Sequence, residues 1–125
     1  VARRILEWSQ KTATRIWYGR GKTAGSFVPV CDHEGTDHQL FAVWSYGTLE
    51  VYFYWYQYKP PFDREDARLR LLERLNQIPG VDLPEEAIRK RPSLPLKLFT
   101  DPQKLTALLD VFEHYLRVVR GEESP

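Results

Sequence analysis

Gly19-Arg20-Gly21-Lys22-Thr23 has the residue types of a phosphate-binding loop, with glycines, a lysine and a threonine in a short segment. A true phosphate loop also needs a glycine five residues before its Gly-Lys pair, and Ile16 stands at that position. It further needs a helix directly after the loop, where free N–H groups bind phosphate, whereas this sequence continues as a strand. The segment is therefore interpreted as a basic loop in which Arg20 and Lys22 can contact a phosphate.

Soft metal ligands are grouped in a second short segment. Cys31, His33 and His38 lie within eight residues, but a structural zinc site uses four ligands, commonly in two close pairs. The only further candidates nearby are carboxylates on the same turn. The segment is interpreted as a solvent-facing polar turn, and no metal ligand is predicted.

Carboxylates around the same turn raise the question of a metal-dependent nuclease. Such enzymes hold their ions with clustered carboxylates, here represented by Asp32, Glu34, Asp37 and Glu50. The expected lysine two positions after the last carboxylate is replaced by Tyr52. Catalysis is therefore the least favoured alternative, and neither a catalytic residue nor a cofactor-binding residue is predicted.

The run of residues 51–58 is predicted to be a strand with two different aromatic faces. Alternation in a strand places Val51, Phe53 and Trp55 on one face. The opposite face then carries Tyr52, Tyr54, Tyr56 and Tyr58. Aromatic rings on a sheet can stack with the bases of single-stranded nucleic acid, and nearby cations can contact phosphates. The predicted binding surface comprises these four tyrosines with Arg15, Arg20 and Lys22.

Two other interpretations of the tyrosine face remain open. It can pack beneath the N-terminal helix, with the hydroxyl groups at the rim of the core. It can also form a protein interface or a homodimer, since tyrosine buries a large area and keeps a polar tip.

Composition places the chain among single globular domains. It has 125 residues, 42% hydrophobic content and a net charge of +1, which argues against a strongly basic nucleic-acid module. The charge is unevenly distributed, because residues 1–31 hold six basic residues and only Glu7 as an acid. Cys31 is the single cysteine, which is typical of a reducing compartment and predicts a cytoplasmic protein. No apolar run is long enough to span a bilayer.

The order of predicted elements indicates an α+β domain with an antiparallel sheet. A helix is expected over residues 2–14, followed by strands over 15–18, 26–31, 39–46 and 49–58. Pro29 should place the second strand at an edge or at a bulge. A helix beginning near Asp63 should bury Ala67, Leu71, Leu75 and Ile78. A short helix over 83–90, an extended connector over 91–99 that can add an edge strand, and a last helix from Thr100 complete the prediction.

Several short sequence segments resemble an uncharacterised bacterial domain family. They include Leu40-Phe41-Ala42-Val43-Trp44, Tyr56-Gln57-Tyr58-Lys59-Pro60-Pro61-Phe62 and Asn76-Gln77-Ile78-Pro79-Gly80-Val81. Similar segments are Gly25-Ser26-Phe27-Val28-Pro29 and Arg91-Pro92-Ser93-Leu94-Pro95-Leu96. Domains of this kind resemble C-terminal parts of longer proteins, some of them nuclease-like. The resemblance implies that residues 1–125 are one domain of a longer chain, and it transfers no residue roles.

The sequence thus predicts a single α+β domain with a four-stranded antiparallel meander, an N-terminal helix and two to three C-terminal helices. The predicted function is a non-catalytic recognition module of a larger bacterial protein that contacts nucleic acid. A protein-interaction or homodimerisation domain is the alternative, and a metal-dependent nuclease is the weakest. The expected partners are the rest of the parent chain, nucleic acid or a second copy, and no membrane.

Overall fold

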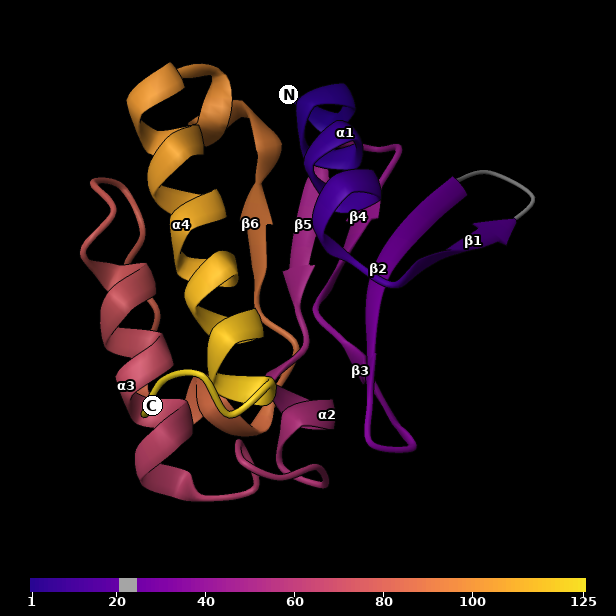
Figure 1. Ribbon diagram of the computed structural model, residues 1–125. Coiled ribbons are helices and arrows are strands. Elements are labelled where there is room, and N and C mark those ends of the chain that lie inside the picture. The colour runs from indigo at the N-terminus through magenta and orange to yellow at the C-terminus, as the bar shows by residue number, and fades with distance from the viewer. Residues whose placement is uncertain (21–24) are drawn as a thin grey trace.

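The protein forms one antiparallel sheet with helices packed on one of its faces (Figure 1). A computed structural model describes residues 1–20 and 25–125, with Arg20 described by its backbone alone. The strands are β1 (Arg15–Arg20), β2 (Gly25–His33), β3 (Thr36–Gln39), β4 (Phe41–Trp44), β5 (Thr48–Val51) and β6 (Ser93–Pro95). The helices are α1 (Ala2–Thr12), α2 (Phe53–Tyr56), α3 (Glu65–Asn76) and α4 (Pro102–Val119), with 3₁₀ turns η1 (Glu85–Arg89) and η2 (Leu96–Thr100).

The α+β class and the antiparallel sheet are confirmed, but the prediction of four strands is wrong. Among the described residues the sheet has six strands in the order β1-β2-β4-β5-β6, and β3 pairs with β2 beside this path. The predicted third strand is divided, because the long strand β2 pairs with β4 near its start and with β3 near its end. The connector after η1 contributes β6, which pairs with β5.

Strands β2 and β3 are joined by a two-residue polar turn. Glu34 and Gly35 both have positive φ, at 49° and 82°. A two-residue turn with this backbone matches the twist of antiparallel strands, and it favours glycine because other side chains are strained there. The turn closes with His33 opposite Thr36 and sets the register that places Asp32 opposite Asp37.

The inner face of the sheet carries the main hydrophobic core. Helices α1 and α4 contact each other over this face, and α3 packs against α4 (Figure 1). The Phe41 ring lies 4.8 Å from the Phe112 ring of α4 and 6.3 Å from the Trp8 ring of α1, measured between centroids. Trp8 also donates a 3.1 Å hydrogen bond from Nε1 to Glu113. These contacts join the N-terminal helix to the C-terminal helix through the sheet.

The prediction that residues 49–58 form one strand is wrong. Strand β5 ends at Val51, and the chain then turns into the short helix α2. Residues 53 and 56 are one helical turn apart, so Phe53 and Tyr56 both enter the core. Tyr54 and Trp55 face outward, with 38% and 39% of their surfaces exposed. The four tyrosines therefore do not form one ladder.

The C-terminal half follows the sequence prediction closely. The four apolar residues expected on the helix after Asp63 are all buried, and that helix is α3, although Ile78 lies just beyond its C-terminal end. The predicted short helix is the 3₁₀ turn η1. The last helix is α4, whose first turn is capped by Asp101, since its carboxylate accepts a 2.9 Å hydrogen bond from the Gln103 N–H.

Candidate recognition site

The outer face of the sheet, opposite the helices of the core, holds an aromatic hollow of about 540 Å³. Its lining comes from four separate parts of the chain: β1 and β2, the end of β3, the α2 segment, and Arg91, which lies two residues before β6. The lining residues are Trp17, Val28, Gln39, Tyr52, Trp55, Tyr58, Lys59 and Arg91. We call this site the aromatic hollow.

The wall on strand β1 is formed by Trp17. Trp17 lies opposite Val28 in the β1–β2 register, so both side chains lie on the outer face. Val28 belongs to a small apolar cluster with Val30 and Ala42, which forms the floor of this face. Trp17 keeps 39% of its surface exposed. A rigid indole ring is thus presented to solvent above a buried apolar floor.

An ion-pair network holds one end of this face. Arg15 donates two hydrogen bonds to Asp32, at 2.8 Å from Nε and 3.0 Å from Nη2, and it stacks on Trp17 with its guanidinium carbon 5.1 Å from the ring centroid. The Arg15 guanidinium holds the pKa of Asp32 below its usual range. Asp37 lies 3.8 Å from Arg15 and 3.5 Å from the Lys59 ammonium group. Two cations near the hollow are therefore already paired with carboxylates.

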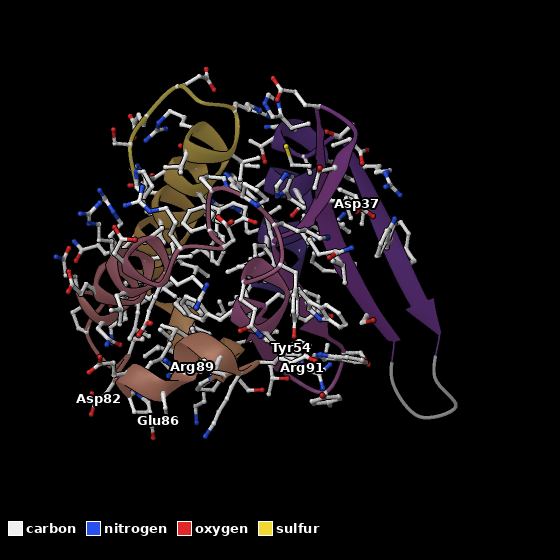
Figure 2. The ribbon with its side chains drawn as sticks, turned by 90° about the horizontal axis from the view of Figure 1, so that it is seen from below. Asp37, Tyr54, Asp82, Glu86, Arg89 and Arg91 are labelled. Atoms are coloured by element: carbon white, nitrogen blue, oxygen red, sulfur yellow. The ribbon has the colours of Figure 1, made fainter. Side chains whose placement is uncertain are left out.

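Arg91 reaches the hollow through pairing of the main chain. The Val51 N–H donates a 2.8 Å bond to the Pro92 carbonyl, and the Tyr54 N–H donates a 2.9 Å bond to the Lys90 carbonyl. These bonds place residues 90–92 beside the α2 segment, and Tyr54 and Arg91 lie next to each other in Figure 2. Arg91 is exposed and forms no ion pair within the described part of the chain.

The tyrosines of the predicted binding surface occupy three different environments. Tyr52 is half-buried in the hollow, and burial raises the pKa of its hydroxyl group. Tyr58 lines the hollow with 61% of its surface exposed, and the Tyr54 ring lies 5.7 Å from it. Tyr56 is 2% exposed within the core, where burial raises its pKa well above the ordinary value. Tyr56 is therefore not available to a ligand.

The predicted cations are also divided. Arg15 stands at the rim, with its charge paired as described above. Lys22 lies outside the described residues, and Arg20 is described only as the last backbone position of β1.

Six of the eight lining residues are absent from the predicted binding surface, among them the two tryptophans and the two cations. Trp17 stands two residues after Arg15 in β1, and this spacing could have placed both side chains on one face of the strand. The predicted strand places Trp55 on the buried face, whereas in the helical turn of α2 its side chain faces outward. Lys59 and Arg91 carry no local signal, since only the β5–β6 pairing and the fold of the α2 segment bring them to the hollow.

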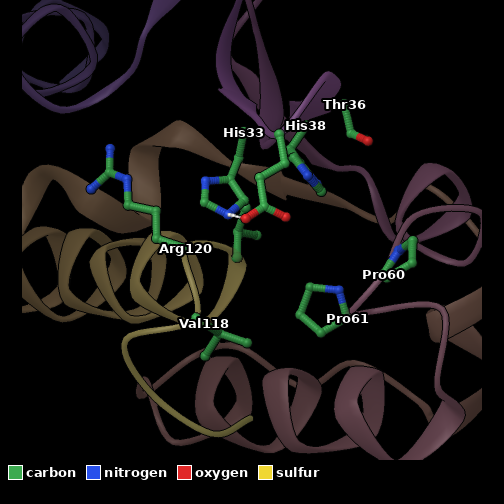
Figure 3. A pocket seen from close by; sticks show the side chains of 10 residues that line it. His33, Thr36, His38, Pro60, Pro61, Val118 and Arg120 are labelled. Atoms are coloured by element: carbon green, nitrogen blue, oxygen red, sulfur yellow. Dashed lines mark ion pairs between the residues drawn. The ribbon is translucent and has the colours of Figure 1, made fainter.

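A second cavity lies on the other side of the β2–β3 hairpin. This histidine cleft of about 400 Å³ separates the hairpin from the end of α4 (Figure 3). Its lining includes His33, Glu34, Thr36, His38, Pro60, Pro61 and Arg120. His33 Nε2 lies 3.6 Å from Glu34 Oε1. His38 is buried, and burial together with the nearby Lys59 charge lowers its pKa. The cleft therefore favours the neutral form of His38.

The candidate metal ligands do not converge. In residues 1–20 and 25–125 no group of three or more His, Cys, Asp or Glu side chains is arranged to hold a metal ion. Cys31 is buried against the main core, while Asp32 and Asp37 are held by Arg15 and Lys59.

Comparison with known proteins adds no family to this description. No protein-family model matches the chain, and neither a curated protein nor a solved structure matches it. Among the described helices, none combines the length and the apolar composition needed to cross a bilayer.

Proposed function

We propose that this domain is a non-catalytic recognition module that binds single-stranded nucleic acid in the aromatic hollow. The observation that carries the proposal is the composition of the lining. Rings of Trp17, Trp55 and Tyr58 stand around an apolar floor, and the cation of Arg91 stands beside them, without a carboxylate among the lining residues. Flat rings bind bases by stacking, and a neighbouring cation binds the phosphate between them.

The geometry favours a single strand over a duplex. A hollow of about 540 Å³ admits unstacked bases but not the width of a double helix. Because the net charge is only +1, phosphate contacts must be few. We therefore expect the logarithm of the association constant to fall with the logarithm of the salt concentration, with a slope of about −1 to −2.

A role as an accessory part of a larger bacterial protein, acting in the cytoplasm, belongs to the same proposal. The resemblance of the sequence to C-terminal bacterial domains supports the attachment to a longer chain. The single, buried and unpaired cysteine is compatible with a reducing compartment.

Fluorescence anisotropy with labelled oligonucleotides tests the proposal. Single-stranded DNA and RNA of mixed sequence should bind at low salt, and a blunt duplex of the same length should bind more weakly. Tyr58→Ala should weaken binding by about 1–3 kcal/mol, or roughly 5- to 150-fold in Kd.

Tyr18→Ala is the matched control. It removes a tyrosine of nearly equal exposure, 63% against 61%, from the inner side of β1 away from the hollow. Binding by this variant should match wild type. The proposal is wrong if no oligonucleotide binds at low salt, or if both variants lose affinity equally.

A protein segment is the second candidate ligand. It is favoured by the pairing of Arg15 and Lys59 with Asp32 and Asp37, which leaves an aromatic face with little net charge. Interface centres are depleted in unpaired charges and enriched in Tyr and Trp. Selection from a displayed peptide library should then return sequences that bind wild type and fail to bind Tyr58→Ala. A library that yields no such sequences contradicts this candidate.

A further inference from the structure

The two edges of the sheet differ in how well they are protected from pairing. Strand β6 has only three residues and ends in Pro95, which lacks an N–H donor. Strand β1 has six residues and no proline, and between its two terminal arginines it contains the apolar and aromatic run Ile16-Trp17-Tyr18. Short strands and prolines prevent an edge from pairing with another chain, whereas a long apolar edge invites it. Strand β1 is therefore the edge open to a partner.

The register shows which main-chain groups of β1 point away from the sheet. The carbonyl of Pro29 accepts a 3.0 Å bond from the Leu40 N–H, so the polar groups of Pro29 face β3 and β4 rather than β1. Ile16 lies opposite Pro29, and Tyr18 lies opposite Phe27, two residues away. Because bonding alternates along antiparallel strands, the N–H and C=O groups of Ile16 and Tyr18 point outward. No strand in the described part of the chain pairs with that side of β1.

We propose that β1 pairs with β1 of a second copy of this chain, antiparallel and centred on Trp17. A twofold axis perpendicular to the sheet places Ile16 opposite Tyr18 of the second copy, and Tyr18 opposite its Ile16. Each of these pairs exchanges both main-chain hydrogen bonds. The outward groups of one copy thus meet the outward groups of the other.

The side chains in this register are self-complementary. Trp17 lies opposite Trp17 of the second copy in a non-hydrogen-bonded pair, where side chains come closest, and aromatic pairs there are stabilising. Arg15 lies opposite Gly19, so no like charges face each other. The Arg15 charge is in addition held by Asp32 within its own chain. In this register Arg15 of each copy therefore meets no like charge on the partner strand.

The proposal is independent of nucleic-acid binding, although it affects the same face. The twofold axis keeps both outer faces on one side of the joined sheet. Trp17 lines the aromatic hollow, so pairing brings the two hollows together across the axis. The interface is narrow, and we expect a dissociation constant on the order of 0.1 mM.

Sedimentation equilibrium across protein concentration and cysteine cross-linking test the proposal. Trp17→Cys should form an interchain disulfide under mild oxidation, because opposite residues in such a pair have Cα atoms about 4.5 Å apart. Tyr18→Cys is the matched control on the same strand. Its two copies lie diagonally, about 7–8 Å apart, beyond the reach of a disulfide. Cys31 is buried and common to both variants.

Wild type should shift from monomer to dimer as its concentration rises, and Trp17→Cys should cross-link at least tenfold faster than Tyr18→Cys. A strictly monomeric wild type at millimolar concentration overturns the proposal. Equal cross-linking of the two variants, or faster cross-linking of Tyr18→Cys, also overturns it, because the register would then be different. Trp17→Cys changes an exposed side chain, and its circular dichroism spectrum verifies that it folds.

Discussion

The hydroxyl group of Tyr56 donates a hydrogen bond to the main-chain carbonyl oxygen of Leu40 inside the core. Leu40 is the residue at which the chain passes from β3 to β4, and among the described residues no main-chain N–H donates to its carbonyl. This bond connects helix α2 to the point at which β3 ends and β4 begins. It explains why a tyrosine in the aromatic run lies inside the protein.

Tyr56→Phe should lower the free energy of unfolding by about 1–3 kcal/mol, because it leaves the buried Leu40 carbonyl without a donor. Urea denaturation followed by circular dichroism measures the change. Tyr58→Phe serves as the control, since its hydroxyl group is exposed and its effect should stay within about 0.5 kcal/mol. Equal effects of the two variants would contradict the assigned role of Tyr56.

Asp101→Ala should destabilise the domain by about 0.5–2 kcal/mol, because α4 loses the side-chain acceptor for the Gln103 N–H. The same denaturation experiment measures it. Asp110→Ala removes an equal charge from an exposed position in the middle of α4 and should cost less. A neutral effect of Asp101→Ala would show that the cap is not needed.

Stability should decrease in mild acid because of His38. Burial holds the folded-state pKa of His38 below its ordinary value of 6.5. The unfolded chain therefore binds a proton first as pH falls, and the stability present above about pH 6.5 is progressively lost below it. In denaturation between pH 7.5 and 5, His38→Gln should show a smaller decrease than wild type. Parallel pH profiles would argue against a depressed His38 pKa.

Arg91→Gln tests the electrostatic part of nucleic-acid recognition. The slope of log Kd against log salt for single-stranded DNA should decrease by about 0.7, the contribution of one phosphate contact. Arg74→Gln removes the same charge from the exposed side of α3 and should leave the slope unchanged. If both variants change the slope equally, the contact is not specific to the hollow.

Much of the C-terminal half could be predicted from local sequence. The apolar spacing of Ala67, Leu71 and Leu75 selects a helical face, and Asp101 before Pro102 marks a helix start. A polar turn after the second strand could likewise be predicted, because residues 32–37 contain the residue types of a turn. In each case the residues that indicate the helix or turn belong to the same short segment that forms it.

The aromatic run could not be predicted in this way. The spacing of Phe53 and Tyr56 fits a helical turn. The spacing of Tyr52, Tyr54 and Tyr56 fits a strand, so the local pattern is compatible with both structures. The helical turn is stabilised by distant groups: the Leu40 carbonyl binds Tyr56, and the Lys90 carbonyl binds the Tyr54 N–H. Periodicity along the chain contains no information about these partners.

By itself the sequence determined the α+β class, the antiparallel pairing and the buried face of α3, because these depend on turn residues and apolar spacing within short segments. The tertiary structure alone decided the number of strands, the burial of Tyr56 and the assembly of the hollow. Trp17, Trp55 and Arg91 are far apart along the chain, and only the β1–β2 and β5–β6 pairings bring them to one lining. Such long-range pairing depends on complementary main-chain and core contacts, which no single segment encodes.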